Sequence, residues 1–335
     1  LYLGDAKILQ FTAVAMMILY EEDKFQMSDP VSKYLPELAN LKLYTDGEES
    51  TAVYNPTIEQ LLTHTAGFTY GYRAASEPVD AMYLEADLIN STDLEDFITR
   101  LSAIPLMFEP GTRYHYSVSF DILGAVVEKI SGQSFDVFLK ERIFDPLQMD
   151  DTFFAVPDNK LHRLTSNHYW NAAESALILP PAELARPYSN VTLFSGGGGL
   201  VSTAMDYLVF CEMLRRGGSY NGVRILGPKT VQYMTADHLT PEIRRNGETD
   251  FPESHLYKGQ SFGLGVGVMQ EPELSEVISS AGAYSWGGAA GTKFWIDPEE
   301  DLVVILLTQL MWAPIDTRYQ MKVATYQALT ELGSD

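Results

Sequence analysis

Apolar residues in the first part of the chain recur at spacings of three and four, the period of helices that pack against a core. This pattern predicts a first helix over residues 6–23, with the apolar run "FTAVAMMILY" at 11–20 followed at once by three acidic residues. Ten apolar residues are about half of a membrane span, so we predict a buried helix. No charged stretch precedes the run and no small-residue cleavage site follows it, so it is not predicted to be a secretory signal.

Further helical patterns follow, most of them between residues 54 and 215. In "PTIEQLLTHTAGF", Thr57 and Gln60 have the spacing of an N-terminal capping box, and Gly67 is suited to end the helix. The other predicted helices are "STDLEDFITRLSAIPL", "SVSFDILGAVVEKISGQSFDVFLKERIFDPL" and, after a glycine turn, "SGGGGLVSTAMDYLVFCEMLRRGG". The single cysteine, Cys211, lies in the last of these and is expected to be buried.

The spacing of apolar residues changes near residue 260. The segments "SFGLGVGVMQ", "TKFWIDP" and "DLVVILLTQL" alternate or run apolar between turn residues, which predicts strands, and a last helix is expected at about 316–332. A helical body followed by a terminal sheet with a covering helix indicates an α+β architecture. We therefore expect a single domain over residues 1–335, mostly helical at about 54–215, with the sheet and terminal helix at about 260–335.

Composition narrows the class of partner. The chain has 335 residues, 46% of them hydrophobic, enough to enclose a large core. A formal charge of −22, from 45 acidic and 23 basic residues, argues against nucleic acid or an anionic membrane, which both require a basic patch. One cysteine excludes an internal disulfide and fits a cytoplasmic location. We predict a small-molecule substrate.

Nothing in the sequence calls for a metal or another cofactor. There is one cysteine, no His-Glu-x-x-His motif, and the histidines lack the spacing of a ligand set, so no metal site is predicted. His64, in "LLTHTAGF", is expected to pack or cap. The stretch "GQSFG" matches the Gly-x-Ser-x-Gly nucleophile motif around Ser261. That motif needs a strand, a sharp turn and a helix, whereas here a strand pattern follows, so Ser261 is not predicted to be a nucleophile.

Two stretches carry candidate chemistry. In "PGTRYHYSVSF", Tyr116 lies on a loop where a helix begins, near Ser117, and the helix dipole there favours loss of the phenolic proton. In "YSWGGAAGTKFWIDP", Trp286, Gly287 and Gly288 lie just before a strand. Glycines at such a place let a ligand approach the main chain, and the amide of Ala289 could face an oxyanion.

Taken together, these pieces resemble the serine β-lactamase superfamily, in the branch of class C β-lactamases, family VIII esterases and penicillin-binding-protein-like transesterases. The resemblance is collinear over nearly the whole chain. It rests on six blocks: "TAVAMMILYEEDKFQMSDPVSKYLPEL", "PTIEQLLTHTAGF", "PGTRYHYSVSFDILGAVVEKISGQ", "ERIFDPLQMDDTFF", "SGGGGLVSTAMDYLVF" and "WGGAAGTKFWIDPEEDLVVILLTQ". It implies a β-lactamase/transpeptidase-like fold, with an antiparallel sheet flanked by helices and a large all-helical region.

The resemblance also implies a site. In that family a serine at the start of the first core helix attacks a carbonyl, and a lysine three residues later helps to deprotonate it. The family's proton-relaying tyrosine corresponds to Tyr116. Its Trp-Gly-Gly element, more typical of esterases than of β-lactamases, corresponds to Trp286–Gly288, with Ala6 and Ala289 at the two sides of the oxyanion hole.

The first motif is where the chain departs from the family. An ungapped alignment places Ala6 at the position of the serine and Leu9 at the position of the lysine, and no lysine in the chain has a serine three residues before it. The family's N-terminal helix and two strands are also expected to be missing from this chain. Their loss would expose an edge strand that a partner chain could cover, which leaves a homodimer open.

Three functions follow. The surviving Tyr116 and Trp-Gly-Gly stretch favour an enzyme that uses acid/base chemistry, such as cyclisation, isomerisation, elimination or hydration, on a small carbonyl-bearing metabolite. The alternatives are a carboxylesterase or acyltransferase whose motif was altered, and a catalytically inactive binding protein. Aromatic residues in the predicted cleft loops indicate an apolar or aromatic ligand; they are Tyr70, Tyr72, Tyr83, Tyr169 and Trp170.

Overall fold

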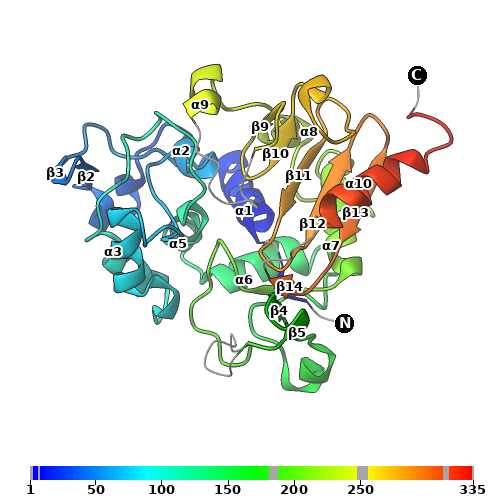
Figure 1. Ribbon diagram of the computed structural model, residues 1–335, viewed down its shortest axis with the longest axis horizontal. Coiled ribbons are helices and arrows are strands. Elements are labelled where there is room, and N and C mark those ends of the chain that lie inside the picture. Colours follow the sequence, from blue (N-terminus) through cyan, green and yellow to red (C-terminus); the bar gives the residue numbers. More distant parts are fainter. Residues whose placement is uncertain (1–2, 7, 181–187, 247–255, 312–316, 334–335) are drawn as a thin grey trace.

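Helix α1 (Leu9–Glu21) forms the centre of the computed structural model, which describes residues 3–6, 8–180, 188–246, 256–311 and 317–333. In Figure 1 the helix, in blue, lies between a helical lobe on the left and a sheet on the right. Every residue from Leu9 to Leu19 is buried, so the helix is enclosed on all sides, as its apolar run predicts.

The start of this region corrects the predicted helix over residues 6–23. Leu3–Ala6 form strand β1, which pairs in antiparallel fashion with β6 (Leu200–Ser202), so that Ala6 lies opposite Leu200. The helix begins only at Leu9. Pairing with a strand far along the chain decides this, and local periodicity carries no information about such a partner.

Five antiparallel strands make the main sheet, in the order β13-β12-β11-β10-β9. They are β9 (Gln260–Phe262), β10 (Gly267–Met269), β11 (Tyr284–Gly287), β12 (Lys293–Asp297) and β13 (Leu302–Leu306). The apolar pattern did not predict strand β11, and Trp286 and Gly287, expected just before a strand, lie within it. The resemblance places the Trp-Gly-Gly element on an edge strand, whereas β11 is the middle strand of the sheet. All four of its residues are buried, so the strand lacks the alternation of a half-exposed strand.

The sheet is the middle layer between two helices. Successive side chains of β12 point to opposite faces. The ring of Phe294 contacts Tyr207 of α7 (Ala204–Arg215) with centroids 5.5 Å apart, whereas Trp295 stacks on Tyr326 of α10 (Thr317–Gln327) at 6.5 Å. Figure 1 shows α10, in red, in front of β12 and β13. Helix α10 is shorter than the predicted 316–332, and Cys211 is buried in α7 as predicted.

The helical lobe contains α2 (Ile58–Leu62), α3 (Pro78–Ala86), α4 (Leu94–Leu101), α5 (Ser119–Ser131) and α6 (Phe135–Leu139). The predicted capping box is present, because the Thr57 side chain accepts from the Gln60 amide and the Gln60 side chain accepts from Thr57. The prediction that Gly67 ends this helix is wrong. Helix α2 stops at Leu62, and His64 turns the chain with a left-handed φ of 54°.

One segment that was predicted to be a loop forms part of a smaller sheet. Within "NHYWNAAESALILPPAELARPY", strands β4 (His168–Asn171) and β5 (Ala176–Ile178) form a hairpin, and β14 (Leu310–Met311) adds to β4. Residues 181–187 of that segment lie outside the described residues. The remaining elements are the hairpins β2–β3 (Lys42–Thr45, Glu48–Thr51) and β7–β8 (Ser219–Tyr220, Val223–Arg224), helices α8 (Pro228–Met234) and α9 (Pro241–Asn246), a π-helical turn (Lys140–Phe144), and 3₁₀ turns at Val31–Lys33, Pro36–Leu38, Leu88–Asn90, Asp158–Arg163 and Pro272–Leu274. Of the helices in the described ranges, none is long and apolar enough to cross a membrane.

Candidate functional site

Tyr116 lies on the loop that leads into α5, whose first helical residue is Ser119 and not the predicted Ser117. The amides of the two residues that flank Tyr116 both donate to His64. The His115 amide donates to the His64 carbonyl at 2.8 Å, and the Ser117 amide donates to His64 Nδ1 at 3.2 Å. The loop therefore holds Tyr116 in a single orientation.

His64 is a buried, neutral anchor for this loop. Burial holds the pKa of His64 well below its ordinary value, and nearby His115 lowers it further. The neutral ring keeps a lone pair on Nδ1, which is what the Ser117 amide requires. The ring also packs against Tyr116, with centroids 4.5 Å apart, and within the described part of the chain its Nε2 has no hydrogen-bond partner.

Two more aromatic rings touch Tyr116. Tyr70 lies 5.2 Å away between centroids, and Trp286 of β11 lies 5.6 Å away. Tyr116 and Trp286 come from opposite sides of the molecule and were both predicted site residues. The structure thus brings the start of α5 and the end of β11 together.

The turn after β11 offers a free backbone donor. The Gly288 amide donates to the Thr292 carbonyl at 3.0 Å, and the Gly288 carbonyl accepts from the Gly291 amide at 3.0 Å and from Arg318 Nη2 at 2.7 Å. Among the described residues, none accepts from the amide of Ala289, which is half-buried. That amide can donate to a ligand oxygen, and the Gly288 amide cannot.

Ala6 and Leu9, the positions predicted to correspond to the serine and the lysine, do not lie on one helix as expected. Ala6 belongs to β1, so Ala6 and Leu9 do not share a helical face. The side chain of Ala6 lies outside the described part, and only its backbone is placed. Leu9 is 3% exposed within the apolar core, with no room for a solvated amine.

Ser261 and the histidines do not form a second site. Ser261 is buried in β9, β10 follows it, and its hydroxyl donates to Asp237, so the Gly-x-Ser-x-Gly match is not a nucleophile turn. Across the described ranges, no group of three His, Cys, Asp or Glu side chains is arranged to hold a metal ion.

The predicted loop aromatics divide into three groups. Tyr70 and Tyr72 stack on each other with centroids 5.2 Å apart and lead to Tyr116. Tyr83 is instead a buried residue of α3. Tyr169 and Trp170 lie in β4. Within the described ranges, the first pair alone is joined to the candidate site by ring contacts.

Sequence reasoning missed the groups behind Tyr70. Asp121, in the first turn of α5, is buried and accepts from the Gly197 amide at 3.2 Å and from the Ser195 hydroxyl. A Cβ on Gly197 would collide with both the Tyr70 hydroxyl and the Asp121 carboxylate. The four-glycine run was the only signal for this contact, and it reads equally well as an ordinary turn.

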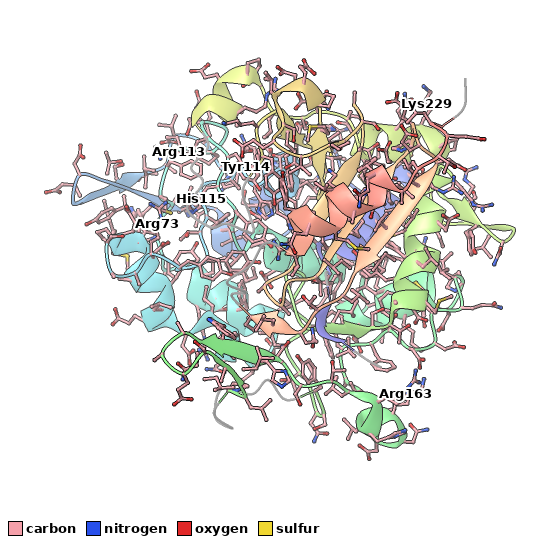
Figure 2. All side chains as sticks on the ribbon, turned by 45° about the vertical axis from the view of Figure 1, so that its right-hand side comes forward. Arg73, Arg113, Tyr114, His115, Arg163 and Lys229 are labelled. Atoms are coloured by element: carbon pink, nitrogen blue, oxygen red, sulfur yellow. The ribbon has the colours of Figure 1, made fainter. Side chains whose placement is uncertain are left out.

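Figure 2 shows the segment that enters the site. Arg113, Tyr114 and His115 lie on the side of the helical lobe, next to Arg73. His115 Nε2 lies 3.3 Å from Thr69 Oγ1, and the Thr69 hydroxyl donates to Asp80 at 2.5 Å. The segment before Tyr116 and the loop around Tyr70 are thus joined by polar contacts.

Comparison with known proteins agrees with this architecture. The model of the Beta-lactamase family matches residues 10–320. Protein Rv1367c of Mycobacterium tuberculosis is 32% identical over 308 residues, which cover 89% of this chain and 74% of that protein. Esterase EstB of Burkholderia gladioli is 26% identical over 315 residues, covering 88% and 74% of the two chains.

Two solved structures are similar over almost the whole chain. EstCE1, a hydrolase with promiscuous acyltransferase activity, is 25% identical with a TM-score of 0.77, covering 97% of this chain and 84% of that one. Simvastatin synthase LovD from Aspergillus terreus shares the fold, with a TM-score of 0.80 over 98% and 85% of the two chains at 24% identity. Relatives of this chain thus include esterases and acyltransferases, and the chain itself belongs to the Beta-lactamase family.

Proposed function

We propose that this member of the family is an enzyme that works by acid/base chemistry at Tyr116, with the Ala289 amide as an oxyanion donor and without an acyl-enzyme. One observation carries the proposal. The ring of Tyr116 contacts Trp286, three residues before Ala289, whose amide has no acceptor among the described residues. This contact supports a shared site of the phenol and the amide, and the proposed correspondence of Leu9 to the family's lysine supports chemistry without the nucleophile pair.

These groups support reactions next to a carbonyl. The Tyr116 oxygen accepts a proton from the carbon beside the carbonyl, and the negative charge that develops on the carbonyl oxygen is stabilised by the Ala289 amide. Return of the proton at another position gives an isomerisation, and loss of a leaving group gives an elimination. The substrate class is a small carbonyl compound.

The test is turnover by the Tyr116→Phe variant. The wild-type protein is incubated with a panel of lactones, β-keto compounds and metabolite extract, and conversion is followed by mass spectrometry. Removal of the hydroxyl should lower kcat on the best substrate by about 10²- to 10⁴-fold. Tyr20→Phe, at the far end of α1, is the matched control and should keep full activity. Full activity in Tyr116→Phe would overturn the proposal.

Ester hydrolysis is the second candidate, and the relatives EstB and EstCE1 favour it. It predicts that Ala6→Ser combined with Leu9→Lys produces a burst with p-nitrophenyl esters and covalent labelling by a phosphonate. Ester hydrolysis by the wild type with a covalent acyl-enzyme detected by mass spectrometry would favour this candidate over acid/base chemistry without an acyl-enzyme. Tight ligand binding without conversion of any compound would instead indicate a binding protein.

A further inference from the structure

We propose that Tyr70 is the positioning residue of the site: its hydroxyl donates a hydrogen bond to the Tyr116 oxygen and stabilises the phenolate that Tyr116 becomes. This inference rests on the proposed function, in which Tyr116 exchanges a proton with the substrate. It adds a second phenol that orients the first and tunes its acidity, and that does not itself touch the reacting atoms.

The two phenols meet directly. Their rings lie 5.2 Å apart at an interplanar angle of 31°, so the two phenols are direct neighbours. Burial raises the pKa of Tyr70 well above its ordinary value, and the neighbouring Tyr116 and Asp121 raise it further. A phenol that keeps its proton is the donor in such a pair, so Tyr116 is the acceptor.

The surroundings fix the Tyr70 hydroxyl in place. On one side it lies against the Cα of Gly197, where any Cβ would collide with it. The Gly197 amide is held by the Asp121 carboxylate at 3.2 Å, and the Ser195 hydroxyl, which donates to Asp121, accepts from the Gly198 amide at 2.9 Å. The hydroxyl thus faces a backbone that cannot move away.

The ring and backbone of Tyr70 are held as well. Tyr72 stacks on the ring at an angle of 24°. The Thr69 carbonyl accepts from the Val118 amide at 3.3 Å, which ties the two loops together within two residues of each tyrosine. Tyr70 and Tyr116 are therefore parts of one rigid unit.

The proton balance is simple. When Tyr116 acts as a base, the substrate proton moves to the Tyr116 oxygen, and the same proton leaves again when Tyr116 acts as an acid. Tyr70 keeps its own proton throughout. Hydrogen bonds to charged groups are stronger than those to neutral ones, so Tyr70 favours the ionised form of Tyr116.

Tyr70→Phe removes this one hydrogen bond and keeps the ring. The readout needs no substrate: tyrosinate absorbance near 295 nm is titrated in each protein and in its counterpart that also carries Tyr116→Phe. The difference isolates Tyr116 among the 19 tyrosines. In Tyr70→Phe we expect the pKa of Tyr116 to rise by about one to two pH units. Tyr72→Phe is the matched control and should leave the pKa of Tyr116 unchanged.

Turnover gives a second readout. The alkaline shift in Tyr116 should move the corresponding limb of the pH–rate profile and lower kcat by about 10- to 100-fold at neutral pH, with KM nearly unchanged. A purely structural role would lower the amount of folded protein and leave the pH profile in place. Gly197→Ala should raise the pKa of Tyr116 as well. Combined with Tyr70→Phe, it should raise that pKa little further, because both changes act on the same contact.

The outcomes separate the two proposals. An unchanged titration of Tyr116 in Tyr70→Phe overturns the role of Tyr70, whatever happens to turnover. Full activity in Tyr116→Phe overturns the proposed function, even if the titration shifts. Should Gly197→Ala fail to fold, the Tyr70→Phe titration still decides.

Discussion

Two helices start near the centre of the molecule, and they differ in what their first turns contain. Helix α1 begins after Ile8 with no side-chain cap and no acidic residue, and its first turn is buried, with the Gln10 and Thr12 side chains donating to the carbonyls of Gly265 and Gly196. Helix α5 begins beside Tyr116 and carries the buried Asp121 in its first turn. The polar side chains at the first start are neutral and bind backbone carbonyls, whereas the second start holds a phenol and a carboxylate.

The difference follows from the cost of burying polar groups. An unpaired hydroxyl or amine in a core is strongly unfavourable, so a buried polar side chain needs partners. At α5 they are present: the Ser117 hydroxyl lies 2.8 Å from that of Ser119, and Asp121 accepts two hydrogen bonds. At α1 the partners are backbone carbonyls and the Tyr207 hydroxyl, which donates to Gln10, while Leu9 packs in the apolar core. The first turn of α1 holds no charged side chain, and of the two first turns only that of α5 holds a buried carboxylate.

Leu9→Lys is expected to change the free energy of unfolding most, and it tests directly whether the start of α1 tolerates a charged group. A lysine at a position that is 3% exposed should lower the free energy of unfolding by about 3–5 kcal/mol at pH 7, because its charge has no partner in the core. The loss should shrink toward pH 10 as the amine loses its proton. Urea denaturation measures both, with Leu9→Met as control. A cost below about 1 kcal/mol would mean that the lysine pocket of the family is still present.

A smaller effect is expected for the anchor of the α5 start. His64→Asn keeps a residue that tolerates the left-handed backbone, yet it should cost about 1–3 kcal/mol because the Ser117 amide loses its acceptor geometry. His162→Asn, at an exposed position, is the control and should be close to neutral.

The same variant has a pH signature. The pKa of His64 is lowered on folding, so the unfolded chain takes up the proton first as the pH falls. The stability that neutral His64 contributes is complete above about pH 6.5 and is lost below it, by up to about 1.4 kcal/mol per pH unit. Wild type minus His64→Asn should show this slope between pH 6.5 and 5. An identical slope in both proteins would assign it to another group.

The smallest effect is expected at His238, whose pKa is raised on folding, whereas that of His64 is lowered. Burial lowers the pKa of His238, but hydrogen bonds to Glu59 and to the Tyr233 carbonyl outweigh it and raise the pKa. The stabilisation is therefore complete below about pH 6.5 and is lost as the pH rises through the higher native value. Because Glu59 is 43% exposed, His238→Gln should cost only about 0.5–1 kcal/mol at pH 6 and less at pH 9. A larger loss at pH 9 would contradict this sign.

The sequence by itself determined the family and most of the elements. The apolar run of α1, the capping box at Thr57 and the strand patterns after residue 260 are local signals, because periodicity and caps depend on neighbours within a few residues. Local motifs also singled out Tyr116 and Trp286, which the structure brings into contact. The sequence alone also shows that Ala6 and Leu9 stand at the positions predicted for the family's serine and lysine.

Tertiary structure alone decided how these pieces meet. Ala6 became part of a strand because β6 pairs with it, and β4 and β5 formed where a loop was predicted. The ring contact between Tyr70 and Tyr116 depends on two loops that are distant in sequence and close in space. Such contacts arise from packing between remote segments, and spacing along a chain does not encode which segments will pack.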